Sequence, residues 1–204
     1  MEARAGKPIF IPGEAGQLEA SFHKVDGAEA LAVVCHPHPL HAGSMNNKVV
    51  MAVTWALVAS KVSVVRFNYR GVGESAGEYG SIMGEVSDAE SVAKWAQNNL
   101  AQPVRIWGGF SFGSYIAAKQ ISEDSQRLIM ISPPISRMPF ADLKVRCDSL
   151  LVMNHDDEVV TFDEVNHYVQ GNYWGDVMFF QKGGHFFHGQ TIRLKNLVAA
   201  WLAG

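Results

Sequence analysis

Short hydrophobic runs alternate with longer amphipathic stretches along most of this chain. Runs with almost no polar interruption are typical of strands covered on both faces of a parallel sheet. These runs lie at 31–35, 62–67, 104–107, 128–131, 150–153 and 177–180. Residues 18–25 alternate between apolar and polar and predict a half-exposed strand, with a further strand predicted at 8–11.

Helices are predicted between these strands. In two of them, apolar residues recur at steps of three and four, which places them on one helix face. The predicted helices span 48–60, 82–100, 111–122, 162–169 and 190–202. This alternation predicts a three-layer α/β domain, with a mostly parallel sheet of about seven or eight strands and helices on both faces. No repeat or linker divides residues 1–204, so we expect a single domain.

Composition and charge narrow the possible partners. A net charge of −3 gives no basis for electrostatic binding to nucleic acid or to an anionic membrane. No apolar run approaches the ~20 residues that cross a bilayer, and residues 1–8 lack the apolar core of a signal peptide. Cys35 and Cys147 are the only cysteines, and an intracellular chain of this kind needs no disulfide. We therefore expect a cytoplasmic protein.

The motif Gly-x-Ser-x-Gly at 109–113 places Ser111 between a predicted strand and a predicted helix. A strand, sharp turn and helix form the setting in which this motif is a nucleophile elbow. Both glycines are expected because a Cβ at either position would collide with the neighbouring strand or helix. The motif recurs around Ser75 at 73–77, where neither a strand nor a helix adjoins it. A flexible turn is the interpretation there.

A serine nucleophile needs a base to take its proton and an acid to orient that base. The candidates are Asp156, Asp157 and Glu158 after the strand at 150–153, and His185 and His188 after the strand at 177–180. In parallel sheets, ligand sites lie beyond the carboxyl ends of the strands, where these residues fall. His185 is favoured because it lies in a glycine-rich turn directly after a strand.

Several segments together resemble the α/β-hydrolase superfamily over nearly the whole chain. They are the loop at 66–75, Asp-Glu-Val-Val at 157–160 and Gly-His-Phe at 184–186. Cys-His-Pro-His-Pro at 35–39 is similar to a subgroup of small bacterial serine hydrolases close to the dienelactone hydrolase branch. The resemblance implies Ser111 as nucleophile, His185 as base and Asp157 as acid, because two valines follow Asp157 at the family's offset. The other two carboxylates are then expected to be solvated loop residues.

The resemblance also implies two backbone donors for the reaction's oxyanion. One is the N–H of Phe112, the residue after the nucleophile, and the other comes from the loop after the strand at 31–35. If His36-Pro37 replaces the family's His-Gly, the N–H of His38 is the second donor, because proline has none. The fixed φ of the prolines would stiffen this loop.

In many relatives a helical cap follows the strand after the elbow helix. Here the corresponding connection, 133–147, contains three prolines and has room for at most a short helix. We therefore expect no cap domain and an open cleft that favours short acyl chains. The expected cleft walls are Leu40, Phe110, Met138, Phe140 and Phe186.

Two other classes of function compete with this interpretation. His-Pro-His-Pro-Leu-His at 36–41 resembles a dinuclear metal pattern, but Leu40 stands where that pattern has a ligand. A non-catalytic hydrolase-like binding protein would usually have a broken triad. The sequence therefore predicts a serine carboxylesterase without metal or cofactor, with a thioesterase or lactonase as the alternative on the same machinery.

Overall fold

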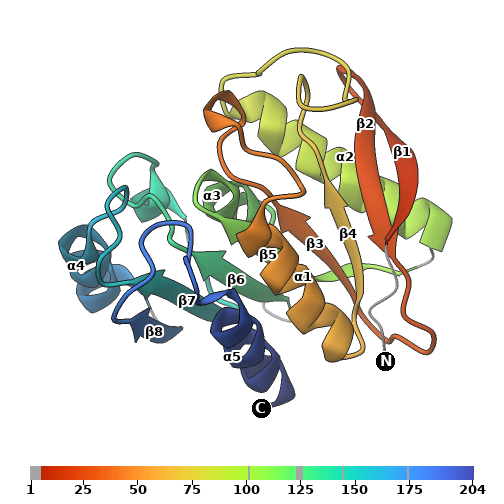
Figure 1. Cartoon of the computed structure of the whole chain (residues 1–204). Helices are drawn as coiled ribbons and strands as arrows, with labels where there is room; N and C mark the ends of the chain where they lie inside the picture. Colours follow the sequence, from red (N-terminus) through yellow and green to blue (C-terminus); the bar gives the residue numbers. More distant parts are fainter. Residues whose placement is uncertain (1–5, 101, 123–125, 144, 174) are drawn as a thin grey trace.

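The structure of the chain is a computed structural model that describes residues 6–204 except 101, 123–125, 144 and 174. Residues 1–5 carry part of the signal-peptide expectation and lie outside the described residues. Figure 1 shows a twisted sheet with helices in front of it and behind it.

The strands and helices follow the hydrophobic pattern closely. The strands are β1 (Lys7–Gly13), β2 (Gly16–His23), β3 (Leu31–Cys35), β4 (Ser63–Phe67), β5 (Val104–Phe110), β6 (Arg127–Ile131), β7 (Asp148–Asn154) and β8 (Asp176–Phe180). The helices are α1 (Lys48–Ala59), α2 (Met83–Leu100), α3 (Phe112–Lys119), α4 (Phe162–Asn172) and α5 (Thr191–Ala203). Short 3₁₀ turns, η1 (Pro39–His41) and η2 (Phe140–Asp142), lie in two of the loops.

The eight strands form one sheet in the order β1-β2-β4-β3-β5-β6-β7-β8. β1 and β2 form an antiparallel hairpin, and β2 pairs antiparallel with β4. All pairs from β4 to β8 are parallel. The strand order reverses between β3 and β5, so the loops after these strands leave in opposite directions and open a crevice between them.

Both faces of the sheet are covered, which explains the uninterrupted apolar runs. In β3, Leu31 and Val33 belong to the core cluster on the side of α2, α3 and α4, whereas Ala32 and Val34 belong to the cluster on the side of α1 and α5. Figure 1 shows α1 and α5 together on one side of the sheet. The predicted three-layer architecture is therefore confirmed.

The expectation that no cap covers the sheet edge is also confirmed. In the described part of the connection from β6 to β7, the only helical element is the three-residue turn η2. The elbow helix α3 ends at Lys119, three residues earlier than predicted. None of the helices in the described ranges is both long and apolar enough to span a bilayer.

Candidate active site

Ser111 lies at the sharp turn between β5 and α3. Its backbone has φ 52° and ψ −120°, a conformation that non-glycine residues rarely adopt and that is often held under strain at functional sites. The N–H of Ser111 donates to the carbonyl of Ile131 on the neighbouring strand, at 2.8 Å. The N–H of Ser114 donates to the Ser111 carbonyl at 2.9 Å and closes the first turn. These bonds hold the strained residue at the carboxyl end of the sheet.

The two glycines of the motif are required by close backbone contacts. A Cβ at Gly109 would overlap the backbone of Gly113, and a Cβ at Gly113 would overlap the carbonyl group of Cys35. The predicted collisions with helix and strand are therefore confirmed. The second contact also presses the start of α3 against the end of β3, where the loop containing His38 begins.

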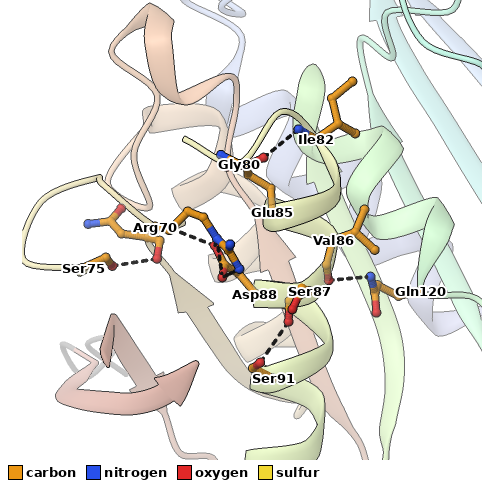
Figure 2. Close-up of polar contacts among 11 residues, drawn as sticks. Arg70, Ser75, Gly80, Ile82, Glu85, Val86, Ser87, Asp88, Ser91 and Gln120 are labelled. Atoms are coloured by element: carbon orange, nitrogen blue, oxygen red, sulfur yellow. Dashed lines mark hydrogen bonds and ion pairs between the residues drawn. The ribbon is translucent and has the colours of Figure 1, made fainter. Parts of the chain in front are cut away.

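The second copy of the motif has a different role. Ser75 is 8% exposed, its hydroxyl donates to the carbonyl of Asn68 at 2.8 Å, and it accepts the N–H of Glu19 at 2.9 Å. Figure 2 shows this serine in the loop after β4, bonded to the backbone. The interpretation of Ser75 as part of a flexible turn is corrected here, because its hydroxyl ties the loop to the hairpin.

Asp157 and His185 form a buried pair at the same edge of the sheet. The Nδ1 atom of His185 lies 2.9 Å from Oδ2 and 3.0 Å from Oδ1 of Asp157, and the two residues are 4% and 6% exposed. Oδ1 of Asp157 also accepts the N–H groups of Val159 and Val160, at 2.9 and 2.8 Å. Since an ionised carboxylate only accepts, Nδ1 carries a proton and Nε2 is left as the basic atom.

The environment of Asp157 favours its ionised form. Burial is the largest influence and raises the pKa of the carboxyl. The hydrogen bond to His185, the N–H of Val160, the charge of His185 and the hydroxyl of Ser132 together outweigh it and lower the pKa below its usual value. An ionised Asp157 can orient the His185 ring and stabilise an imidazolium.

The neighbouring carboxylates Asp156 and Glu158 bind the backbone of the histidine turn. Asp156 accepts the N–H groups of Gly183 and Gly184, at 3.2 and 2.9 Å, and Glu158 accepts the N–H of His185 at 3.0 Å. Both are exposed loop residues, as expected, but they also bind the backbone of this turn. All three consecutive carboxylates hold the turn, but only Asp157 contacts the imidazole.

His188 and Asn154 flank this arrangement. His188 is exposed, and its Nδ1 lies 2.9 Å from Nζ of Lys48, away from Asp157. The buried amide of Asn154, at the end of β7, donates to the carbonyl of Gly184 at 2.8 Å. Our sequence reasoning overlooked Asn154, although a polar residue that ends a buried strand was a usable signal.

A cavity of about 590 Å³ lies against Ser111 and His185. Its apolar lining includes Ile82, Phe112, Met138, Val159 and Phe186, and its polar lining includes His38, His41, Asn47, Tyr79 and Arg137. Of the residues predicted to wall the cleft, Met138 and Phe186 therefore lie there. The structure also brings both predicted oxyanion residues, His38 and Phe112, to this cavity.

The expectation that Phe110 and Phe140 wall the cleft is wrong, because they are 0% and 1% exposed. The Phe110 ring packs against the His185 ring instead, with the two centroids 4.9 Å apart. Phe140 packs in the core beneath the loop, 5.3 Å from the ring of Tyr115. Leu40 is 67% exposed on η1 and does not line this cavity.

One wall of the cavity comes from the loop before α2, which the sequence pattern did not single out. Ile82 in this loop has φ 79°, unusual for a β-branched residue. The buried carboxylate of Glu85 accepts the N–H groups of Gly80 and Ile82, at 2.8 and 2.9 Å. Asp88, one turn further, pairs with Arg70 at 2.7 Å, and Figure 2 shows both carboxylates reaching toward the loop. Together they fix the strained wall.

The predicted oxyanion donors lie on opposite sides of the crevice between β3 and β5. Phe112 is the first residue of α3, so its N–H has no partner within its own helix. The His38 carbonyl accepts the N–H groups of His41 and Gly43, at 3.0 and 3.2 Å, which folds the loop tightly. The His38 ring packs on Phe112, with centroids 4.8 Å apart.

His36 is unsuited to bind a metal. It is fully buried, its Nδ1 lies 2.6 Å from the carbonyl oxygen of Pro37, and its Nε2 accepts the N–H of Tyr69 at 3.1 Å. Both ring nitrogens are therefore engaged. Across the described residues, no group of three or more His, Cys, Asp or Glu side chains is placed to hold a metal ion.

We expect His36 to make the protein sensitive to acid. Burial lowers the pKa of His36 from 6.5 to about 3, the bond to Pro37 raises it, and the charge of His38 lowers it. Between these values the unfolded chain binds a proton that the folded state does not, so stability falls as the pH falls. The free energy of unfolding should drop by ~1.4 kcal/mol per pH unit over much of this window.

Denaturant unfolding at pH 7, 6 and 5 measures this effect. The wild-type protein should lose stability with a steeper slope than His36→Asn, which has no group titrating at that position. Equal slopes in the two proteins would show that His36 does not titrate differently on folding.

Comparisons with known proteins agree with this fold. No family model matches the chain. Protein RP471 of Rickettsia prowazekii is 31% identical over 95% of this chain and 87% of its own length. An α/β serine hydrolase homologue from Coxiella burnetii is 36% identical, with a TM-score of 0.89 over 98% of this chain and 99% of that one. An α/β serine hydrolase without a lid from Xanthomonas campestris is 30% identical, with a TM-score of 0.89 over 97% and 94%. The chain therefore belongs to the α/β serine hydrolases that lack a lid.

Proposed function

We propose that residues 1–204 act as a single-domain serine carboxylesterase on small acyl esters. The observation that carries the proposal is the buried Asp157–His185 pair, with its imidazole facing the same cavity as Ser111 on a strained elbow. This is the combination of nucleophile, base and orienting acid that acyl transfer requires.

In the proposed reaction, Ser111 Oγ attacks the ester carbonyl while Nε2 of His185 takes the hydroxyl proton. The tetrahedral oxyanion accepts hydrogen bonds from the N–H groups of Phe112 and His38. Collapse of this intermediate breaks the bond to the alkoxide oxygen, which leaves as an alcohol with the proton from His185. Water then attacks the acyl-enzyme while His185 takes one of its protons. His185 returns this proton to Ser111 Oγ as the acyl–oxygen bond breaks, which releases the carboxylic acid and restores Ser111. Each oxyanion donor typically contributes ~2.7–4 kcal/mol to transition-state stabilisation.

Short acyl esters are the expected substrates. The cavity has apolar walls, but no cap encloses it, so each CH₂ beyond the walls contributes less than the ~0.8 kcal/mol of full burial. On a panel of p-nitrophenyl esters from two to sixteen carbons, kcat/KM should peak at short chains and then fall. The rate should also show no jump at the substrate's solubility limit.

A parallel panel of thioesters and lactones with matched acyl groups distinguishes an esterase from a thioesterase or a lactonase. The proposal expects the highest kcat/KM on oxygen esters. A higher value on thioesters or lactones would identify a thioesterase or lactonase. A kcat/KM that climbs beyond about eight acyl carbons would contradict the expectation that the uncapped cavity cannot bury a long acyl chain.

A further inference from the structure

The peptide unit between Pro37 and His38 is held by the side chain that precedes it. The carbonyl of this unit belongs to Pro37, and its oxygen lies 2.6 Å from Nδ1 of His36. The N–H of the same unit belongs to His38, the proposed oxyanion donor. The described chain contains no cis peptide, so the carbonyl and the N–H of this planar unit point in opposite directions. A contact that fixes the direction of the Pro37 carbonyl therefore also fixes the direction of the His38 N–H.

The tautomer of His36 follows from its two contacts. A backbone N–H can only donate, so Nε2, which lies 3.1 Å from the N–H of Tyr69, must be the unprotonated nitrogen. In the neutral ring the proton then sits on Nδ1 and is donated to the Pro37 carbonyl. The ring is 0% exposed, and its centroid lies 4.2 Å from that of Tyr69, so it has little freedom to turn away.

Few other motions are available to this peptide unit. Its plane can rotate only through ψ of Pro37 and φ of His38, because the proline ring fixes φ of Pro37. On the far side, the His38 carbonyl is held by the N–H groups of His41 and Gly43, at 3.0 and 3.2 Å. Gly43 also approaches the Pro37 carbonyl so closely that a Cβ there would overlap it. The bond from His36 therefore constrains the remaining rotation of the donor.

We propose that His36 is a positioning residue that orients the His38 N–H toward the oxyanion, through its hydrogen bond to the Pro37 carbonyl. The inference rests on the proposed function, in which that N–H is a donor. His36 itself touches no reacting atom and acts only through the peptide unit. Its loss should therefore lower kcat and leave KM nearly unchanged, since the donor is needed most in the transition state.

Two substitutions separate the two hydrogen bonds of His36, from Nδ1 to the Pro37 carbonyl and from the Tyr69 N–H to Nε2. In His36→Asn, an amide N–H can occupy the place of Nδ1 and still donate to Pro37. In His36→Gln, the amide lies near the place of Nε2 and can satisfy Tyr69 but not Pro37. We expect kcat to fall about 10–100-fold in the Gln variant, which is part of the loss that removal of a whole donor produces. The loss of kcat in the Asn variant should be at least tenfold smaller than the loss in the Gln variant. His167→Gln, an exposed histidine on α4, is the matched control and should leave kcat unchanged.

The affinity of phenylboronic acid provides a second measurement that does not depend on ester turnover. Boron forms a tetrahedral adduct with the serine, and its oxygen occupies the oxyanion position. Affinity should fall in His36→Gln in parallel with kcat and be largely retained in His36→Asn. If the wild-type protein binds the boronate but cleaves no ester, the proposed substrate is wrong while the role of His36 is still measured.

Three results would overturn the inference. They are equal losses of kcat in the Asn and Gln variants, a rise in KM without a change in kcat, and unchanged boronate affinity in the Gln variant. If the variants do not fold, ¹⁵N NMR of the wild-type imidazole decides instead. A neutral ring protonated at Nδ1 supports the orientation described, and a proton on Nε2 refutes it.

Discussion

Replacement of Ser111 by alanine is expected to reduce kcat for ester hydrolysis by on the order of 10⁶-fold, as removal of a triad nucleophile does. It should also abolish covalent labelling by a fluorophosphonate. The fold should persist, because the backbone bonds of Ser111 to Ile131 and Ser114 do not use its hydroxyl. Turnover, intact-protein mass after labelling and circular dichroism together measure the result.

Ser75→Ala is the matched control from the second copy of the motif. It removes the hydroxyl that joins Asn68 and Glu19, so it should cost ~1–3 kcal/mol of stability and leave labelling intact. Labelling that persists in Ser111→Ala and disappears in Ser75→Ala would assign the nucleophile to the other loop.

Replacement of His185 by alanine is expected to reduce kcat by 10⁴-fold or more, roughly the effect of losing a triad base. Asp157→Asn should lower kcat by about 10⁴-fold, because an amide can donate to Nδ1 and so favour the wrong tautomer. Steady-state kinetics on a short ester, with KM measured separately, tests both variants.

The neighbouring residues supply the controls for this pair. His188→Ala removes an exposed ring that contacts Lys48 and should cost far less activity. Asp156→Asn keeps an oxygen that can accept one N–H of the glycine turn, so its effect should also be much smaller than that of Asp157→Asn. The reverse ranking in either pair would show that the neighbour is the catalytic group.

The periodicity of apolar residues was sufficient to predict the sheet, because burial on both faces leaves a clear trace in the sequence. The elbow was predictable for a related reason, since Gly109 and Gly113 are dictated by local backbone contacts. The cleft walls were less predictable. Whether Phe110 faces substrate or packs behind His185 depends on how a loop more than seventy residues away returns to the sheet.

Side chains that act on distant backbone left weaker traces. Glu85 and Asp88 lie on α2 among apolar residues, and only the structure shows that they bind the loop before the helix and Arg70. The hydrogen bonds of Asp156 and Glu158 could not be predicted, because exposed carboxylates in a loop usually have only water as their partner. Here the partners are the N–H groups of a turn about 27 residues later.

The close packing of Gly113 against Cys35 is expected to make one part of the proposed active site stiffer than the rest. Ser111 and the loop that carries His38 are joined by this contact, by the pairing of Cys35 with Gly109 and by the His38 ring on Phe112, so we expect their separation to vary little. His185 lies in the loop after β8, at the far end of the sheet, and is held by the carboxylates that bind its turn and by the ring of Phe110. We therefore expect thermal motion to change the distance between Ser111 and His185 more than the distance between Ser111 and His38. The three consecutive carboxylates would limit this change, because their hydrogen bonds hold the turn that carries His185.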